Sequence, residues 1–211
     1  CLQFGRFGPK GTNFPALWNG HEDWARDYAA AVARYFGPSG AEKLCTSIEI
    51  GNEPGKDFDD ALYQRLFRAM ARGIRDADPR VKIVTCTAHA APADAYHKSL
   101  EETFGAPEML PLFDVINVHT YATKPKAPGR SPWERSYPED PDIDYLQRVD
   151  AAIAWRDAHA PGKEVWVTEF GYDACTPEAM QHRTGWFEKL DWRGVTDRRQ
   201  AQYLVRSLLA F

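Results

Sequence analysis

Short β-branched runs alternate with amphipathic helical patterns along this chain, and this alternation constrains its fold more than any other feature. Val, Ile and Thr are enriched in four strand-like segments, at residues 46–52, 80–87, 113–121 and 164–170. A helical pattern precedes the first strand, and one follows each of them, at residues 22–36, 57–77, 93–104, 142–159 and 197–211. Regular strand–helix alternation predicts βαβ units and a parallel sheet.

The helical pattern at residues 57–77 is the clearest, because four apolar residues lie four positions apart on one face: Leu62, Leu66, Met70 and Ile74. Apolar and aromatic residues also recur at helical spacing within residues 22–36: Trp24, Tyr28, Val32 and Tyr35. Thr196 is placed to cap the last helix, and residues 1–21 are expected to form a loop.

The strand ends indicate which parallel fold is present. No GxGxxG turn follows any predicted strand, which disfavours a doubly wound dinucleotide-binding sheet. Polar residues gather at the carboxyl ends of the strands, where a (β/α)8 barrel carries its functional groups. Four units are half a barrel, and the 211 residues fall short of the ~250 that a full barrel usually takes. We therefore predict an α/β fold, a TIM-barrel fragment forming a single catalytic domain over residues 1–211, truncated at both ends.

Composition excludes several classes of function. The net charge is −4 and no block of like charges occurs, so a nucleic-acid surface is not expected. No apolar run approaches the ~20 residues that span a membrane. The four cysteines lack metal-binding spacing and are expected to be buried or free thiols. The chain begins without Met, so its localisation stays open, compatible with a secreted or periplasmic enzyme, and its oligomeric state is also open.

Asn52 and Glu53 stand at the end of the first predicted strand. Pro54 follows them and has no N–H to donate, so the β-ladder must stop there. Side chains alternate along a regular strand, so Asn52 and Glu53 can face one site only if the strand bulges or breaks at this point. Glu53 is therefore a candidate catalytic acid at a strand end.

Glu169 ends the last predicted strand in the same way. It shares a face with Val165 and Val167, so its carboxylate caps an apolar column. Two carboxyl groups at two strand ends, Glu53 and Glu169, are the pair that hydrolysis of a glycosidic bond requires. No metal or organic cofactor is needed for this chemistry.

His119 and Tyr121 end the third predicted strand. They lie two positions apart and share a face, with Asn117 lower on the same face. A tyrosine hydroxyl can donate to an ionised carboxylate, and an imidazole can bond a sugar hydroxyl or orient a carboxylate.

Three short motifs, in this order, resemble those of the clan A glycoside hydrolases, which are retaining (β/α)8-barrel enzymes: Asn52-Glu53-Pro54, His119-Thr120-Tyr121 and Thr168-Glu169-Phe170-Gly171. The resemblance extends from the helix at Trp24 to the helix at Gln200, and it is nearest to families 39 and 5. In that clan these motifs end barrel strands four, six and seven. The chain would thus cover strands four to seven of an incomplete barrel, without the clan's early-strand Arg or His and its strand-eight Trp.

The resemblance implies a role for each matched residue. Glu53 would be the general acid/base and Glu169 the nucleophile. Asn52 would bind the sugar 2-hydroxyl, and His119 and Tyr121 would support the site, with Tyr121 touching the nucleophile. The activity implied is double-displacement hydrolysis of O-glycosidic bonds in a β-linked oligo- or polysaccharide.

Tryptophans in the predicted loops are candidate sugar platforms. Trp133 follows the third strand and Trp186 follows Glu169, while Trp18 and Trp192 lie in similar segments. Each of these rings has the alternative of packing its own loop against the barrel. Arg130, Arg135 and His182 could contact acidic or hydroxylated sugars, or be solvated.

Two other functions remain open for such a barrel. A divalent ion could be bound at the strand ends by Glu53, His89, His119 and Glu169, which would make a metal-dependent sugar-processing enzyme. The barrel could also bind carbohydrate without catalysing its hydrolysis. Survival of activity in EDTA separates the first alternative from a glycosidase.

Overall fold

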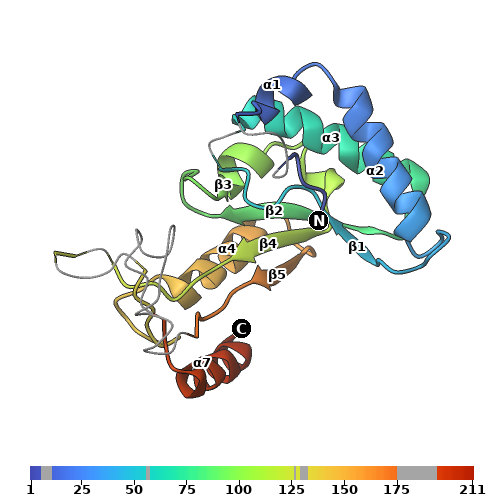
Figure 1. The fold of residues 1–211 in the computed structure, drawn as a ribbon. Coiled ribbons are helices and arrows are strands. Elements are labelled where there is room, and N and C mark those ends of the chain that lie inside the picture. The colour runs from blue at the N-terminus through green and yellow to red at the C-terminus, as the bar shows by residue number, and fades with distance from the viewer. Residues whose placement is uncertain (6–10, 56–57, 126, 129–132, 175–193) are drawn as a thin grey trace. The chain divides into compact units, whose positions relative to one another are not determined.

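The structure is a computed structural model that describes residues 1–5, 11–55, 58–125, 127–128, 133–174 and 194–211 (Figure 1). The chain divides into two compact units. The first unit comprises Cys1–Val118 and Ala152–Trp166, and the second comprises His119–Ala151 and Val167–Phe211. The single catalytic domain over residues 1–211 stays a prediction.

The first unit holds most of the helices and strands. In chain order its elements are α1 (Phe14–Trp18), α2 (Glu22–Phe36), β1 (Ser47–Glu49), α3 (Asp60–Ala77), β2 (Lys82–His89), β3 (Lys98–Ser99), the π-helix η2 (Leu100–Phe104), the 3₁₀-helix η3 (Leu110–Leu112) and β4 (Val115–His119). They are followed by α4 (Tyr145–His159), β5 (Glu164–Glu169) and α7 (Asp197–Ala210), of which α7 lies wholly in the second unit. None of the helices in the described ranges has the length and hydropathy of a membrane span.

The strands form a sheet in the order β1-β2-β4-β5, with β3 paired to β2 beside this path. β2 runs parallel to β1, β3 and β4, with Ile48 opposite Ile83 and Val84 opposite Val115. The strand order follows the chain order, as it does in a barrel and not in a doubly wound sheet. The predicted parallel α/β arrangement is confirmed, whereas its assignment to barrel strands four to seven stays a prediction.

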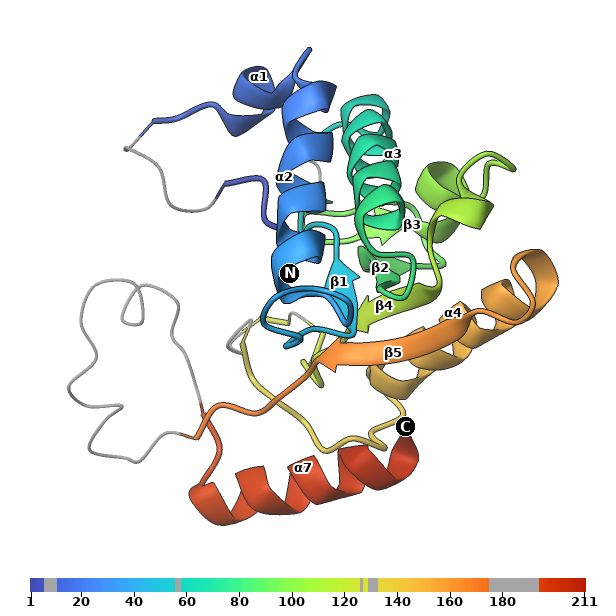
Figure 2. The same cartoon turned by 90° about the vertical axis from the view of Figure 1, so that its right-hand side faces the viewer.

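Helices α2 and α3 lie side by side in both views (Figure 1 and Figure 2). The face predicted for α3 is buried, including Leu62 and Ile74. α3 begins at Asp60, three residues later than predicted. The bounds of α2 are as predicted, but its buried face consists of small residues: Ala25, Ala29, Ala30 and Ala33. A Cβ on Gly73 would lie 2.3 Å from the carbonyl oxygen of Arg26, so the two backbones are too close for large side chains between them.

The aromatic residues of α2 are therefore on its outer face. Trp24, Tyr28 and Tyr35 are 53%, 42% and 50% exposed. Their helical spacing predicted the helix correctly, but it does not mark the face that packs against α3.

The helix predicted at residues 93–104 is wrong over residues 93–99, which do not form a helix. The Asp94 carboxylate accepts hydrogen bonds from the backbone N–H groups of Tyr96 and His97, both at 2.8 Å, and this turn competes with a helix. Only η2 is helical in this stretch. The predicted loop at residues 1–21 also contains a short helix, α1, which Asn13 caps by accepting from the N–H of Ala16 at 3.1 Å.

The second unit is built around a small apolar core. Four buried residues form its centre, and five partly buried ones pack on them: Ala122, Ile143, Tyr145 and Tyr172, with Leu146, Phe170, Val195, Tyr203 and Leu204. As predicted, Thr196 caps α7, and its hydroxyl accepts from the N–H of Arg199 at 3.3 Å.

Candidate active site

The chain breaks out of β1 before it reaches the first candidate carboxylate. β1 ends at Glu49, three residues earlier than the sequence predicts, and Gly51 has a φ of +83°, which favours glycine. The N–H of Thr87 then donates to the carbonyl oxygen of Asn52 at 3.0 Å. Asn52 and Glu53 consequently sit in a turn pinned to β2, and both line one hollow, which the break makes possible.

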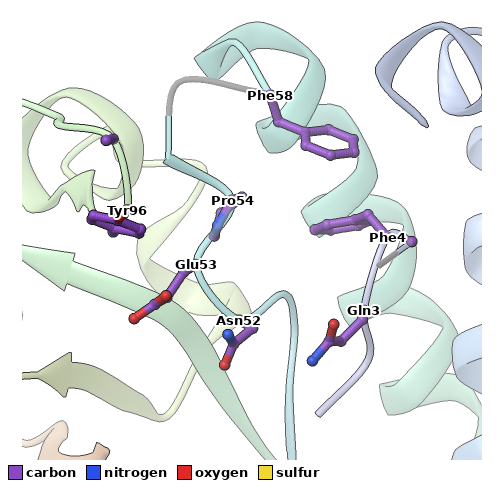
Figure 3. Close-up of a pocket in the computed structure, with 9 residues that line it drawn as sticks. Gln3, Phe4, Asn52, Glu53, Pro54, Phe58 and Tyr96 are labelled. Carbon is purple, nitrogen blue, oxygen red and sulfur yellow. The ribbon is translucent and has the colours of Figure 1, made fainter. Parts of the chain in front are cut away.

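This hollow lies wholly in the first unit and encloses about 270 Å³ (Figure 3). Its wall includes Asn52, Glu53, Phe58 and two residues that no sequence motif marks, Gln3 and Tyr96. Gln3 fell in a predicted loop and Tyr96 in a wrongly predicted helix. Neither had a neighbouring motif that could have marked it.

The N-terminal segment forms one wall because it pairs beside β1. The N–H of Leu2 donates to the carbonyl oxygen of Glu49 at 2.7 Å, and the N–H of Gly51 donates to that of Leu2 at 2.8 Å. The indole N–H of Trp18 donates to the carbonyl oxygen of Phe4 at 2.5 Å. Trp18 thus packs its own segment, which was the alternative to a sugar platform.

In the second unit, Glu169 is held from two directions. The Tyr121 hydroxyl donates a hydrogen bond to Oε1 of Glu169. Nδ1 of His119 lies 3.5 Å from Oε2 of the same carboxylate, and the His119 side chain is 2% exposed. The N–H of Thr120 also donates to the carbonyl oxygen of Glu169 at 3.0 Å, which aligns the ends of β4 and β5. These contacts give the carboxylate one fixed orientation.

Arg135 supports Tyr121 in turn. Its guanidinium lies over the Tyr121 ring, 4.8 Å from the centroid, and its Nε donates to Oδ2 of Asp173 at 3.0 Å. A further hydrogen bond runs from its Nη1 to the hydroxyl of Thr123. The Arg135 side chain is only 5% exposed, so it braces the loop from within and is not a solvated residue.

Asn117 forms a separate polar contact inside the first unit. Its Nδ2 donates to Oε1 of Glu49 at 2.9 Å, which joins β4 to β1. Its backbone N–H donates to the hydroxyl of Thr85 at 2.9 Å, within the stretch where the register between β2 and β4 shifts.

Of the remaining candidate residues, only Trp133 lies among the described residues. Trp133 is half-buried in the loop after β4. Trp186 and Trp192, together with Arg130 and His182, lie outside the described residues. Their predicted contacts with sugar stay predictions.

His89 has close neighbours within the first unit, where its possible ligand atoms lie within 4.8 Å of those of Asp94 and His97. Its Nε2 is 2.9 Å from the carbonyl oxygen of Pro92, and Nδ1 of His97 is 2.9 Å from Oδ1 of Asp94. The two imidazole rings are stacked at 4.9 Å. These contacts tie the end of β2 to the turn around Asp94.

Three described cysteines, Cys1, Cys45 and Cys86, are free, as expected, and Cys175 lies outside the described residues. Burial raises the pKa of the Cys86 thiol to about 12, which makes it unreactive near neutral pH.

No family model matches this sequence, and no curated protein does either. Its fold is shared with glycoside hydrolases of known structure. The GH53 catalytic domain of Ignisphaera aggregans is 17% identical with a TM-score of 0.57, over 100% of this chain and 54% of that one. A family 39 glycoside hydrolase from Bacteroides cellulosilyticus WH2 is 18% identical with a TM-score of 0.54, over 91% of this chain and 34% of that one.

A third similar structure is the GH2 beta-galacturonidase of Eisenbergiella tayi bound to glycerol, 19% identical with a TM-score of 0.50, over 93% of this chain and 27% of that one. The chain thus spans between a quarter and about half of these solved chains. At such identities the likeness shows a glycosidase-type fold and leaves the chemistry to be argued from the residues.

Proposed function

We propose that this chain carries the catalytic carboxylates of a retaining glycoside hydrolase of clan A, nearest to families 39 and 5. Glu169 is the nucleophile and Glu53 the general acid/base. The substrate is a β-linked oligo- or polysaccharide, cut at an O-glycosidic bond, and the chain contributes barrel strands four to seven. One observation supports the proposal most: the Glu169 carboxylate at the end of β5 is bonded by Tyr121 and approached by His119.

A nucleophilic carboxylate must present one oxygen to the anomeric carbon in a fixed direction. The Tyr121 hydroxyl and the Nδ1 atom of His119 each lie beside a different oxygen of Glu169. Donors to a carboxylate stabilise its negative charge and fix its orientation. This is the support that attack on an anomeric carbon needs.

The reaction then follows double displacement. Glu169 attacks the anomeric carbon while the bond to the leaving oxygen breaks and Glu53 gives that oxygen its proton. Glu53, now a carboxylate, takes a proton from the water that attacks the glycosyl ester and frees Glu169. The mechanism requires the two carboxyl groups ~5–5.5 Å apart in the working enzyme. Asn52 holds the 2-hydroxyl, and Trp133 and Trp186 stack on neighbouring sugars.

The stereochemistry of the product tests this proposal. In the full-length enzyme, proton NMR of the first product formed is expected to show the anomeric configuration of the substrate. Glu169→Gln is expected to abolish turnover, and Glu53→Gln to lower it ~10²–10⁴-fold with a sugar leaving group. Glu164→Gln, an exposed carboxylate at the start of the same strand, is the matched control and is expected to keep activity. An inverted product, or activity in Glu169→Gln, contradicts the proposal.

A further inference from the structure

Two histidines and a carboxylate gather beside the end of β2, and the proposed mechanism uses none of them. His89, Asp94 and His97 each offer one ring nitrogen or carboxylate oxygen, and these atoms lie within 4.8 Å of one another. All three residues belong to the first unit. Imidazole nitrogens and carboxylate oxygens are ligands that Zn²⁺ accepts, so this cluster is a candidate metal site.

The pairing of β2 with β3 brings the two imidazoles together. His89 ends β2 and lies opposite Ser99 of β3 in a parallel register. His97 precedes Ser99 by two residues, and side chains alternate along a strand, so His97 points to the face that Ser99 and His89 share. The two rings are accordingly stacked, with centroids 4.9 Å apart. The pairing of the backbone therefore sets the distance between the two histidines.

A hydrogen bond orients each of the two rings. Nε2 of His89 lies 2.9 Å from the carbonyl oxygen of Pro92. A carbonyl oxygen can only accept, so Nε2 carries the proton and the lone pair of the neutral ring is on Nδ1. Nδ1 of His97 lies 2.9 Å from Oδ1 of Asp94. Histidines that bind metal ions are held in the same way, by a carbonyl or a carboxylate beside one ring nitrogen.

Asp94 supplies the negative charge that a cation site needs. Burial raises the pKa of its carboxyl group, but hydrogen bonds from the backbone of His97 and Tyr96 and from the His97 ring lower it to about 2, so the group is ionised at neutral pH. The Asp94 side chain is 44% exposed, which gives an ion a path from solvent. An ion that replaced the proton between His97 and Asp94 would release that proton on binding.

The side chains need only a small movement to close on an ion. Atoms bound to one tetrahedral Zn²⁺ at ~2.0–2.2 Å lie about 3.3 Å apart. The possible ligand atoms are at most 4.8 Å apart, so the longest separation must shrink by no more than about 1.5 Å. The χ2 torsion of histidine has a broad energy minimum, so both rings can turn by this amount at little cost.

The backbone that carries the cluster is braced. The N–H of Asp94 donates to the carbonyl oxygen of His97 at 3.0 Å, which closes the turn between them. Gly55 has a φ of +46°, and a Cβ at this position would lie 2.0 Å from the carbonyl oxygen of Ala95. Only glycine permits so close an approach. A braced turn keeps the possible ligands near one another before an ion arrives, which lowers the entropic cost of binding.

We propose that His89, Asp94 and His97 bind Zn²⁺, with a water molecule as the fourth ligand. Three protein ligands and one water form a tetrahedral site of the open kind. The two imidazoles favour Zn²⁺ over Ca²⁺ and Mg²⁺, which take oxygen ligands. The ion would join the end of β2 to the turn that carries Tyr96. The inference does not rest on the proposed glycosidase function, in which these three residues have no role.

Calorimetric titration of the full-length protein with zinc chloride, after EDTA has been used and removed, tests the proposal. Loss of a residue that only supports a metal ligand already costs ~10–100-fold in affinity. Three substitutions are therefore each expected to weaken zinc binding ~100-fold or more: His89→Gln, His97→Gln and Asp94→Asn. The matched control is His159→Gln, an exposed histidine stacked on Trp155, which should bind zinc as wild type does. Saturating calcium or magnesium chloride should leave the wild-type titration unchanged.

Unchanged zinc affinity in the three variants, or an equal loss in His159→Gln, would overturn the inference. A second measurement uses wild type alone and does not depend on whether the variants fold. In crystals grown with zinc chloride, anomalous scattering at the zinc edge is expected to place the ion between His89, Asp94 and His97. An ion only elsewhere, or one found here only at concentrations where calorimetry detects no binding, is an adventitious ion only and would also overturn the inference.

The metal site and the proposed function fail separately. Hydrolysis by wild type is expected to continue in EDTA, because the ion takes no part in the double displacement. A protein that binds Zn²⁺ at this cluster and hydrolyses no glycoside would contradict the proposed function alone. A protein that hydrolyses its glycoside and binds no Zn²⁺ would contradict the metal site alone.

Discussion

The Tyr121 hydroxyl donates a hydrogen bond to Oε1 of Glu169, although the two residues are 48 positions apart. They meet because Thr120 and Glu169 pair through the backbone, which brings the end of β4 beside the end of β5. Arg135 then covers the Tyr121 ring from the following loop. A strand pairing and a buried cation together set the position of this hydroxyl.

Tyr121→Phe removes only this hydroxyl and is expected to lower kcat by ~10–100-fold. A hydrogen bond to a charged group contributes ~1.5–3 kcal/mol, and here it would support the carboxylate that we propose as the nucleophile. Steady-state kinetics of the full-length enzyme measure the effect, with Tyr137→Phe, an exposed ring in the same unit, as control. A kcat within twofold of wild type would mean that Tyr121 does not serve the reaction.

Arg135→Met keeps an apolar stem of similar length but removes three contacts, to Tyr121, Asp173 and Thr123. Because the side chain is 5% exposed, the free energy of unfolding is expected to fall by ~2–4 kcal/mol. Urea denaturation followed by circular dichroism measures it. Arg206→Met, whose arginine is 43% exposed, should cost no more than ~1 kcal/mol, and equal costs for both would contradict the buried role of Arg135.

Gly55→Ala tests the close approach between the turn after Glu53 and the backbone of Ala95. Gly20 offers a matched control, because its φ of +83° is also left-handed but an added Cβ there meets nothing within 4 Å. Gly20→Ala is expected to cost ~1 kcal/mol for backbone strain alone. Gly55→Ala should lower the free energy of unfolding by ~1–3 kcal/mol more than Gly20→Ala does, since the backbones must separate. Thermal unfolding of the two variants measures this difference, and equal losses would rule out the contact.

The lowered pKa of Asp94 predicts that the stability of the fold depends on pH. Burial raises the pKa of this carboxyl, but hydrogen bonds from the backbone of His97 and Tyr96 and from the His97 ring outweigh it and lower the pKa to about 2, from 3.8. A lowered pKa stabilises the fold above the unfolded value, so the contribution is present above about pH 4 and disappears as the pH falls to about 2. Its size is on the order of 1 kcal/mol, because Asp94 is 44% exposed.

The comparison of wild type with Asp94→Asn isolates this contribution. The difference in their free energies of unfolding, measured in urea between pH 2 and pH 7, is expected to be largest above pH 4 and to shrink below it. A difference that stays constant across this range would show that the Asp94 carboxylate is not the source.

The sequence predicted a helix and its packed face correctly where the residues at helical spacing are also the ones that are buried. In α3 the apolar residues that recur at helical spacing are the ones that are buried, and Thr196 caps α7 as predicted. In α2 the aromatic residues at helical spacing are not the buried ones, because alanines permit the close contact with α3 and the larger aromatics lie on the outer face. Periodicity reports that a helix exists, and it reports the packed face only when the neighbour leaves room for large side chains.

Only part of the candidate site could be predicted from the sequence, for a related reason. Asn52, Glu53, His119, Tyr121 and Glu169 stand beside strand ends, so local motifs marked them. Other contributors act through contacts far along the chain: Gln3 through pairing beside β1, Tyr96 through the Asp94 turn, and Arg135 through Tyr121 and Asp173. No local pattern encodes such contacts.

Covalent trapping of the nucleophile tests the central proposal most directly. A 2-deoxy-2-fluoro-β-glycosyl fluoride of the sugar that the full-length enzyme hydrolyses should form a stable ester, since the fluorine slows its hydrolysis. Digestion and tandem mass spectrometry are expected to place the added mass on Glu169. A label on any other residue, or an enzyme that turns over its substrate and forms no ester, would contradict the assignment of Glu169 as the nucleophile.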